Sequence, residues 1–469
     1  MTTELWRWDA VDLARAIRLG QVSSRDAVES CLKRLEAVNP KLNAVTVVLA
    51  DQARKDAEAA DKAVKAGAPL GLLHGVPVTI KENIDQAGQA TTNGVVAFRD
   101  MVATTDSPPV ANWKKAGAVI IGRTNTPAFS LRWHTDNELR GRTFNPWVQE
   151  VTPGGSSGGA GAAVAAGMCP LAHGNDYGGS IRYPAYACGI AGIKPTFGRV
   201  PTFNPSGAEE RPPTAQMMAV QGPLARKVRD LRLGLAAMAA RDPRDPWWVP
   251  APPEGAPAPR PIKVALIVDP GKGGVDPAVA AAVRRAGDAL ADAGYAVEEA
   301  EPLMISEAAE LWRLLVLNEV RHLSAAQMRE LGGAQLKRAV DLQLEIVPDL
   351  DLVTYMKSLG QRARHLREWM LFFERYPIVV GPVSTEPPFK VGFDTGDTRR
   401  MKEVLHAQRL LVAVNHLGLP GVAVPAGNAD GIPLGVQVIA GRYREDLALD
   451  AAEAIEARHG LATPIDPRW

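Results

Sequence analysis

Cysteine is scarce in this sequence of 469 residues, which contains only Cys31, Cys169 and Cys188. Three is an odd number, and no two of them have the C-x-x-C spacing of redox motifs and zinc sites. The sequence therefore argues against a disulfide framework and against a bound zinc ion. We expect a protein of a reducing compartment, with a cytoplasmic location.

An excess of charge of one sign is also missing. The chain has 53 Lys and Arg residues against 52 Asp and Glu residues, which gives a formal net charge of +1. Binding to nucleic acid or to an anionic membrane surface depends on clustered positive charge. We therefore expect neither nucleic acid nor membrane as a partner.

Long apolar runs are absent as well. No stretch reaches the roughly 20 apolar residues of a membrane-spanning helix, and the apolar run from Ala160 to Cys169 is too short. The stretch from Met1 to Asp9 has neither the basic start nor the apolar core of a signal peptide. With 46% hydrophobic and 22% charged residues, the composition is typical of a soluble globular protein.

Strand-like and helix-like segments alternate along the chain, which predicts an α/β fold with a mixed sheet sandwiched between helices. The first clear helix starts at the capping sequence Ser23-Ser24-Arg25-Asp26 and is predicted to end at Asn39-Pro40. Further strands are predicted at 75–81, 118–122, 262–268, 295–299, 376–383 and 434–441, and further helices at 51–65, 110–116, 275–293, 401–416 and 445–459.

We expect one domain over residues 1–469, with two segments of distinct composition. Residues 241–261 are rich in proline and include Trp247 and Trp248. They form either a domain linker or a strap laid over one domain, and the tryptophans favour the strap because a free linker would leave them in water. Residues 305–374 are rich in Leu, Arg and Glu and are predicted to form a helical cap over the substrate site.

The chemistry of the chain is concentrated in two serine-glycine clusters and one lysine. The clusters span Thr152 to Gly159 and Gly174 to Arg182, and Lys81 ends the predicted strand that lies upstream of both. Serine is a nucleophile once a base removes its proton, and lysine is such a base when it is uncharged. Consecutive glycines allow backbone N–H groups to converge on an oxyanion.

Three structures are conceivable for the first cluster. A flexible linker does not fit, because an alanine-valine helix is predicted directly after it, at 160–166. A phosphate loop requires Gly-Lys-Ser/Thr, and the cluster contains no lysine. The interpretation that remains is a structured turn at a helix N-terminus, where N–H groups favour negative charge.

The same cluster matches the G-x-S-x-G pattern of a nucleophile elbow, which would make Ser156 the nucleophile of an α/β-hydrolase. An elbow also needs an acidic residue and then a histidine downstream. The available histidines are in no distinctive sequence context: His322, His365, His406 and His416.

Taken alone, Lys81 and the Gly178-Gly179-Ser180 sequence each have an ordinary explanation: a solvated charge at a strand end, and a tight turn with a buried serine. The apolar strand before Lys81 favours burial, which would lower its pKa and free the amine to act as a base. The Ser30 to Lys33 segment matches S-x-x-K, but the companion S-D-N and K-T-G motifs of that Ser–Lys chemistry are absent.

Together these stretches resemble the amidase signature family. The resemblance covers most of the chain and is most specific in the two serine clusters at their mutual spacing. The matching segments are 75–83, 152–161, 176–185, 192–199 and 222–226, with weaker likeness at 22–45 and 420–468.

The resemblance implies a catalytic role for three side chains. Ser180 would be the nucleophile, Ser156 a bridging serine held by a cis peptide bond, and Lys81 the base. The backbone N–H groups that would form the oxyanion hole are those of Tyr177, Gly178, Gly179 and Ser180. No metal and no organic cofactor would be required.

Other residues near the clusters are assigned to loop support or to the substrate pocket. Ser157, Asp176 and Arg182 are interpreted as loop support, with Asp176 and Arg182 able to pair. Possible residues of the substrate pocket are Phe129, Trp133, His134 and Gly155, and for the first three ordinary packing is an equal alternative. Three departures from the family pattern are Asn175, where many relatives carry Thr or Ser, Tyr177, whose ring would narrow or polarise the pocket, and Ala128, where relatives often have Glu.

The expected function is hydrolysis of a small-molecule amide through an acyl-enzyme, with aryl or alkyl amides, carbamates (urethanes) and esters as candidate substrates. One alternative is the amidotransferase component of a tRNA-dependent complex, which hands ammonia to a partner chain, although we find no glutamine-site pattern. Another is a binding protein with a decayed site, which the intact Lys81, Ser156 and Ser180 argue against. A homodimer is conceivable by analogy with the family.

Overall fold

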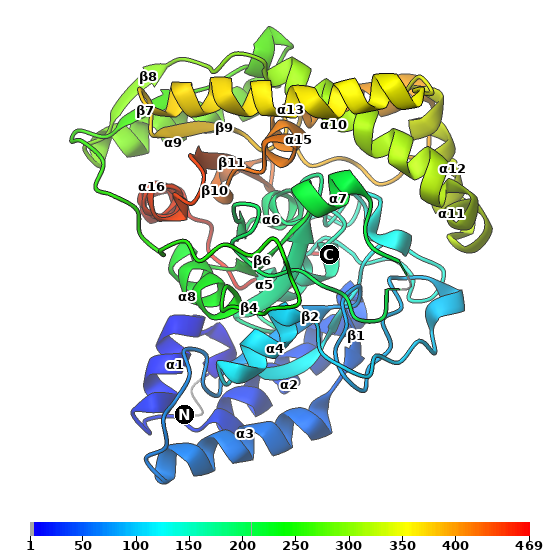
Figure 1. The fold of residues 1–469 in the computed structure, drawn as a ribbon. Coiled ribbons are helices and arrows are strands. Elements are labelled where there is room, and N and C mark those ends of the chain that lie inside the picture. The colour runs from blue at the N-terminus through cyan, green and yellow to red at the C-terminus, as the bar shows by residue number, and fades with distance from the viewer. Residues whose placement is uncertain (1–3, 208) are drawn as a thin grey trace.

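The fold is described from a computed structural model that covers residues 4–207 and 209–469. Met1 to Thr3, the first part of the stretch compared with a signal peptide, lie outside the described residues. The chain forms helices that surround one large sheet (Figure 1). The predicted α/β fold with a mixed sheet is confirmed.

The sheet contains both parallel and antiparallel pairs, and the described residues contribute 11 strands in the order β1-β3-β2-β4-β6-β5-β10-β11-β9-β7-β8. The strands are β1 (Val45–Val48), β2 (Pro77–Lys81), β3 (Val119–Thr124), β4 (Leu171–Asp176), β5 (Ala191–Lys194), β6 (Val220–Ala225), β7 (Lys263–Leu266), β8 (Ala296–Glu299), β9 (Ile378–Pro382), β10 (Gly421–Ala429) and β11 (Ile432–Ala440).

The helices pack around this sheet and carry most of the remaining apolar residues. They are α1 (Ala10–Arg18), α2 (Ser24–Leu42), α3 (Ala50–Lys65), α4 (Pro108–Lys115), α5 (Gly158–Ala165), α6 (Arg182–Cys188), α7 (Pro213–Met218), α8 (Val228–Met238), α9 (Pro277–Asp292), α10 (Ile305–Glu319), α11 (Ala325–Leu331), α12 (Gly333–Glu345), α13 (Leu352–Phe373), α14 (Thr398–Ala407), α15 (Arg409–Leu417) and α16 (Glu445–His459).

Helix α2 continues through the proline that was predicted to end it. Pro40 lies inside the helix, which ends at Leu42 with Asn43 in the left-handed conformation at its C-cap. Proline has no N–H, so the helix lacks the hydrogen bond that this residue would otherwise donate to the carbonyl four residues earlier. The Asn39 Oδ1 then accepts the N–H groups of Ala44 and Val45, which would otherwise be free beyond the helix.

Parallel pairing between β2 and β4 brings the lysine and the second serine cluster together. Val78 and Thr79 pair with Leu171 and Ala172, and both strands run toward the same sheet edge. Lys81 ends β2, and the second serine cluster begins at the end of β4. Ligands of such sheets bind outside the carboxyl ends of the strands, where these residues lie.

The proline-rich segment 241–261 runs along the surface and is tied to it at several points. Trp248 Nε1 donates to the Ala239 carbonyl at 3.1 Å, and Val249 N donates to the Gly198 carbonyl at 2.9 Å. The Trp247 ring packs against Phe197 with ring centroids 5.9 Å apart. These contacts hold the segment against the surface of the molecule.

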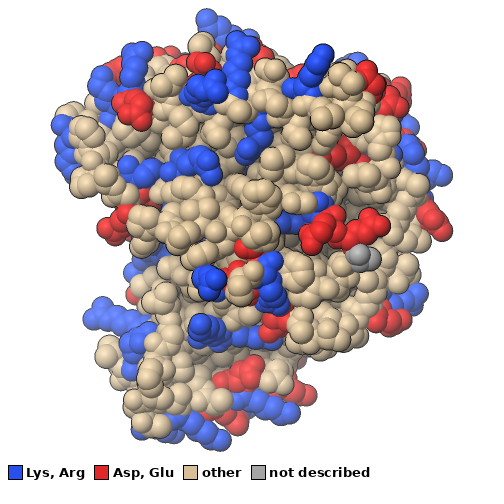
Figure 2. All heavy atoms as spheres, viewed as in Figure 1, with Lys and Arg blue, Asp and Glu red and all other residues tan. Residues whose placement is uncertain are grey.

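Residues 305–374 form α10, a π-helical turn (Val320–Ser324), α11, α12 and α13. Figure 1 shows these elements at one end of the molecule, opposite the N-terminal helices α1, α2 and α3. We call residues 305–374 the cap. No helix in the described ranges has both the length and the apolar character needed to cross a membrane. Figure 2 shows acidic and basic side chains interspersed over the visible face.

Candidate active site

Lys81 lies at the centre of the site and is fully buried. Its Nζ is 2.7 Å from Ser156 Oγ and 2.7 Å from Asn175 Oδ1. Burial lowers the pKa of Lys81 well below its ordinary value, an effect that the Asp176 charge only partly opposes. Burial thus favours the uncharged form of the amine, which lies beside a serine hydroxyl.

Ser156 belongs to the turn that precedes α5, and the peptide bond between Gly155 and Ser156 is cis. This turn is bonded to the second serine cluster. Ser157 N donates to the Ser180 carbonyl at 3.2 Å, and Ser157 Oγ donates to the Asn175 carbonyl at 3.5 Å. The first cluster is therefore a structured turn at a helix N-terminus.

Asp176 organises the loop that follows β4. Its carboxylate accepts the N–H groups of Gly179 at 2.8 Å and Ile181 at 3.2 Å, and pairs with the Arg182 guanidinium at 3.0 Å. Burial alone would raise the pKa of Asp176, but Arg182 and the other donors hold that pKa well below its usual range. Asp176 and Arg182 therefore form a buried ion pair beneath the loop.

One N–H group that the resemblance assigns to the oxyanion hole has a side-chain partner in this structure. The N–H of Gly179 was expected in the oxyanion hole, but it is donated to Asp176 Oδ1. Gly179 has φ +99°, a conformation that L side chains rarely adopt, and it turns its N–H to the carboxylate beneath the loop.

Two tryptophans hold the outer side of the same loop. Trp312 Nε1, from α10 of the cap, donates to the Tyr177 carbonyl at 2.9 Å. Trp133 Nε1 donates to the Gly178 carbonyl at 2.7 Å, and the two indole rings stack with centroids 6.4 Å apart. A Cβ at Gly178 would lie 2.5 Å from Trp312, so glycine is required for this close approach.

Ser156 and Ser180 line one cavity of about 870 Å³. Its wall includes Phe129, Tyr177 from the loop after β4, and four residues of the cap: Val316, Glu319, Val320 and Met328. A smaller recess beside Ser180 is lined by Trp133 and Trp312. The cavity thus joins two serines, an aromatic wall and the cap.

Two of the residues proposed for the pocket do not line this cavity. The His134 ring is buried and shares a hydrogen bond of 2.8 Å with Thr152 Oγ1. Burial, with the nearby Arg132 charge, lowers the pKa of His134 to about 3, so the ring is neutral. Gly155 is packed against the backbone of Arg132, Trp133 and His134. Phe129 and Trp133, in contrast, face the cavity or its recess.

Of the two partners of Lys81, Ser156 was expected from the resemblance, whereas Asn175 was not predicted from the sequence. Asn175 Oδ1 accepts from Lys81, and Asn175 Nδ2 donates to Asn83 Oδ1 at 2.9 Å. Asn83 lies within a stretch that carried the resemblance, and Asn175 was noted only as a departure. Trp312, Thr214 and Glu319 were missed because they come from segments with no motif.

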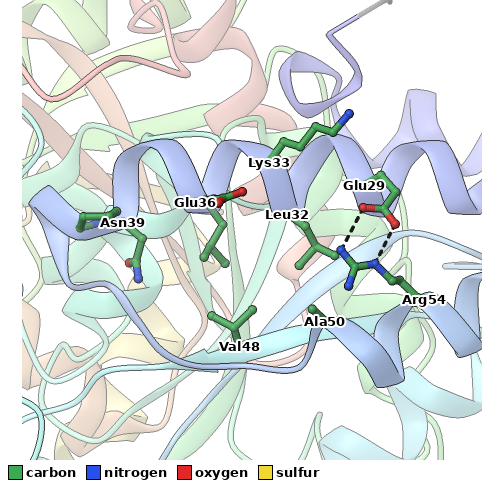
Figure 3. Close-up of a pocket in the computed structure, with 10 residues that line it drawn as sticks. Glu29, Leu32, Lys33, Glu36, Asn39, Val48, Ala50 and Arg54 are labelled. Atoms are coloured by element: carbon green, nitrogen blue, oxygen red, sulfur yellow. Dashed lines mark hydrogen bonds and ion pairs between the residues drawn. The ribbon is translucent and has the colours of Figure 1, made fainter.

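A separate groove of about 500 Å³ lies between α2, β1 and α3 (Figure 3). Its side chains include the Glu29–Arg54 ion pair, with Oε1 and Nε 2.8 Å apart. The lining residues contain no serine, cysteine or histidine. Because it offers no serine or cysteine nucleophile and no histidine base, the groove is not our candidate for amide chemistry.

Comparisons with known proteins agree with this geometry. The sequence profile of the amidase family matches residues 26–449. The chain is 51% identical over 458 residues to indoleacetamide hydrolase from Bradyrhizobium diazoefficiens, covering 97% of this chain and 87% of the relative. It is 32% identical to a component of the glutamyl-tRNA(Gln) amidotransferase from Moorella thermoacetica, with 97% of each chain covered.

Among solved structures, the fold resembles that of a bacterial aryl acylamidase of the amidase signature family. The two structures superpose with a TM-score of 0.82 at 26% identity, over 96% of each chain. Since the family profile covers most of the sequence, the resemblance read from the two serine clusters is confirmed. The chain belongs to the amidase signature family and is an amidase, a hydrolase of amide bonds.

Proposed function

We propose that this amidase hydrolyses a primary arylacetamide of the indoleacetamide type through an acyl-enzyme on Ser180. The observation that carries the proposal is the contact between the buried Lys81 Nζ and Ser156 Oγ, at the cavity that also contains Ser180. The substrate class is supported by the relative named indoleacetamide hydrolase and by the aromatic wall of the cavity.

Lys81 acts as the base in this proposal, and Asn175 orients it. A neutral amine has two N–H donors and one lone pair. Asn175 Oδ1 engages one N–H at 2.7 Å, and the lone pair accepts the Ser156 hydroxyl proton. Ser156 in turn accepts the proton of Ser180 as Ser180 attacks the amide carbonyl.

The developing oxyanion is stabilised by backbone N–H groups of the loop after β4. Gly179 is engaged by Asp176, so we assign this role to Tyr177, Gly178 and Ser180. In a trans peptide the carbonyl and the following N–H point in opposite directions. Trp312 holds the Tyr177 carbonyl, so the Gly178 N–H of the same peptide points away from the Trp312 side chain.

The tetrahedral intermediate then collapses. The proton on Ser156 passes to the leaving nitrogen while Lys81 returns its proton to Ser156, the C–N bond breaks, and ammonia departs to leave an ester on Ser180. Water attacks this ester with the same Lys81–Ser156 pair as base and releases the arylacetic acid. The bound carbonyl carbon is attacked twice, and no redox change occurs.

The cavity fits a substrate of this size. Its volume of about 870 Å³ lies within the range of roughly 300–1,000 Å³ that is usual for small-molecule sites. Aromatic side chains favour flat apolar ligands through offset or edge-to-face contacts. Carbamates and esters present the same electrophilic carbonyl, so both belong in the substrate panel.

A nucleophile elbow built on Ser156 is disfavoured by the surroundings of the histidines. Within the described ranges, no histidine is hydrogen-bonded to Ser156. His322 bonds to Asp349, His406 bonds to the Gly273 carbonyl, and His365 faces His416 with ring centroids 5.4 Å apart.

A fluorophosphonate probe followed by peptide mapping tests the nucleophile. We expect one adduct on Ser180 in the wild type and none in Ser180→Ala. Ser156→Ala, which keeps the nucleophile, should label far more slowly but still on Ser180. An adduct on Ser156 that survives in Ser180→Ala would contradict the assignment.

Ammonia release from a panel of amides tests the substrate class. We expect indoleacetamide and phenylacetamide to be hydrolysed with higher kcat/KM than anilides, carbamates, esters or glutamine. Preference for glutamine, or activity only after addition of a partner chain, would instead favour the amidotransferase alternative.

A further inference from the structure

A chain of hydrogen bonds leads from the catalytic loop to the cap. The Tyr177 hydroxyl bonds to Thr214 Oγ1, and Thr214 Oγ1 donates to Glu319 Oε2. Glu319 Oε1 also accepts from Thr214 N at 2.9 Å and from the Tyr355 hydroxyl at 2.5 Å. The chain thus connects the loop after β4, α7, α10 and α13.

The donor and the acceptor in each of these hydrogen bonds can be assigned by starting from the Glu319 carboxylate, at which the series ends. Three donors converge on the Glu319 carboxylate, which is therefore used only as an acceptor. The Thr214 hydroxyl donates its single proton to Glu319. Thr214 Oγ1 must therefore accept the proton of the Tyr177 hydroxyl. Burial and the Glu319 charge raise the pKa of Tyr177, so the phenol keeps that proton.

The consequence is that Tyr177 presents only lone pairs to any other partner. Tyr177 and Glu319 both line the cavity that contains Ser180. None of the ion pairs found in the described ranges includes Glu319, although Arg211 lines the same cavity. Tyr177 and Glu319 themselves therefore accept hydrogen bonds, and neither has a proton to give to a ligand.

We propose that Tyr177 and Glu319 select amides whose aromatic ring carries an N–H donor. This inference rests on the proposed arylacetamide hydrolysis and specifies its substrate. The backbone of Tyr177 lies at the oxyanion loop and its hydroxyl lies at Thr214. A substrate with its carbonyl at the loop extends along the Tyr177 side chain and places a ring N–H near the acceptors.

A ring without such a donor would desolvate the Tyr177 hydroxyl oxygen and leave its accepting lone pair without a partner, although the hydroxyl proton stays bonded to Thr214. Sites that hydrogen-bond a substrate N–H reject the analogue that lacks it, because the buried polar group loses its partner. A substrate ring that carries an acceptor at this position, such as an oxygen, would also be repelled because its lone pairs face those of the Tyr177 oxygen. Both effects lower kcat/KM for a substrate without a ring N–H, and neither changes how Ser180 attacks the amide carbonyl.

The test compares indoleacetamide with its benzothiophene analogue, in which a slightly larger sulfur atom without a proton replaces the ring N–H. For the wild type we expect kcat/KM to be about tenfold or more higher for the indole substrate. Tyr177→Phe keeps the ring and the backbone N–H but removes the acceptor. It should bring the two values within about twofold by lowering only the indole value.

Substitutions of Thr214 provide the matched pair. Thr214→Val removes the hydroxyl at nearly constant volume and frees the Tyr177 proton to turn into the cavity, so the preference for the indole should fall. Thr214→Ser keeps the hydroxyl and should retain the preference. The benzothiophene rate of each variant serves as the internal reference for folding and for the chemical step.

Equal kcat/KM values for the two substrates in the wild type would overturn the inference, as would an equal loss for both substrates in Tyr177→Phe. Absence of hydrolysis of both arylacetamides, with other amides still cleaved, would also overturn it. That last result is distinct because it refutes the proposed function itself, whereas the first two leave arylacetamide hydrolysis standing.

Discussion

Lys81 is the single residue whose protonation state has the largest consequence for the site. Because burial lowers its pKa well below the ordinary value of 10.5, the amine is uncharged at pH values where an exposed lysine is protonated. A base must be unprotonated, so kcat/KM should rise as the pH rises through this lowered pKa and then stay level. A pH–rate profile whose rising limb lies near 10.5 would contradict the assignment.

Removal of the amine should abolish most of the activity. We expect Lys81→Met to lower kcat by about 10²–10⁴-fold, the usual contribution of a general base. Lys194→Met is the matched control, since Lys194 is also fully buried but its Nζ bonds to the Pro195 carbonyl at 3.1 Å. The control should keep most of the wild-type kcat, and an equal loss in both variants would point to a structural effect.

The residues of the catalytic set differ in how far the sequence could predict them. Lys81, Ser156 and Ser180 lie in glycine-rich or strand-end contexts that carry a local signal. Asn175 has no such signal, because its contact with Lys81 depends on the register between β2 and β4. A neighbour across a sheet is set by strand pairing, which a single sequence does not give.

At the level of elements, the loop after β4 depends on indole donors from two other segments. Trp312→Phe keeps an aromatic ring beside Gly178 but removes the N–H that holds the Tyr177 carbonyl. We expect kcat to fall about tenfold with KM little changed, because one misdirected oxyanion donor weakens transition-state binding. Steady-state kinetics on indoleacetamide measures both parameters.

Trp133→Phe is the informative comparison. Trp133 holds the Gly178 carbonyl, and the N–H on the opposite side of that peptide is already bonded to Asp176. The peptide therefore retains one anchor, and the fall in kcat should be smaller than in Trp312→Phe. A larger loss in Trp133→Phe would mean that the two tryptophans do not act through these carbonyls.

The sequence predicted six of the strands in the described ranges, and it missed β1, β4, β5, β6 and β10 together with helices α1, α6, α7 and α8. β10 was not predicted, because Pro425 and Gly427 interrupt an apolar run that would otherwise suggest a strand. The sheet tolerates them where the pairing with β11 shifts register, between Pro425 and Asn428. The helix predicted at 401–416 is divided at Gln408 into α14 and α15.

On the scale of the whole molecule, Arg182 joins parts of the chain that are distant in sequence. Its guanidinium bonds to Asp176, to the Leu411 carbonyl at 2.9 Å and to Gln437 Oε1 at 3.0 Å. These contacts link β4 with α15 and β11. Buried groups of this kind are costly to leave without a partner.

Arg182→Lys should therefore destabilise the fold. Lysine cannot reproduce the several directed donors of the guanidinium, and breaking a buried ion pair costs about 3–5 kcal/mol. Thermal unfolding followed by circular dichroism should show a clearly lower Tm. Arg232→Lys, which alters an exposed pair with Asp450, should change the Tm little; similar shifts in both variants would contradict the role of the buried pair.

Trp312 lies in the cap, and this placement has a consequence for the modularity of the enzyme. An exchange of cap helices between related amidases would transplant a pocket wall together with one anchor of the loop that faces the carbonyl. Chimeras selected for a new substrate would then lose turnover unless the incoming cap brings an equivalent donor. In such a scaffold, a change of cap alters substrate specificity and catalytic rate together. Directed evolution of specificity therefore has to screen for turnover as well.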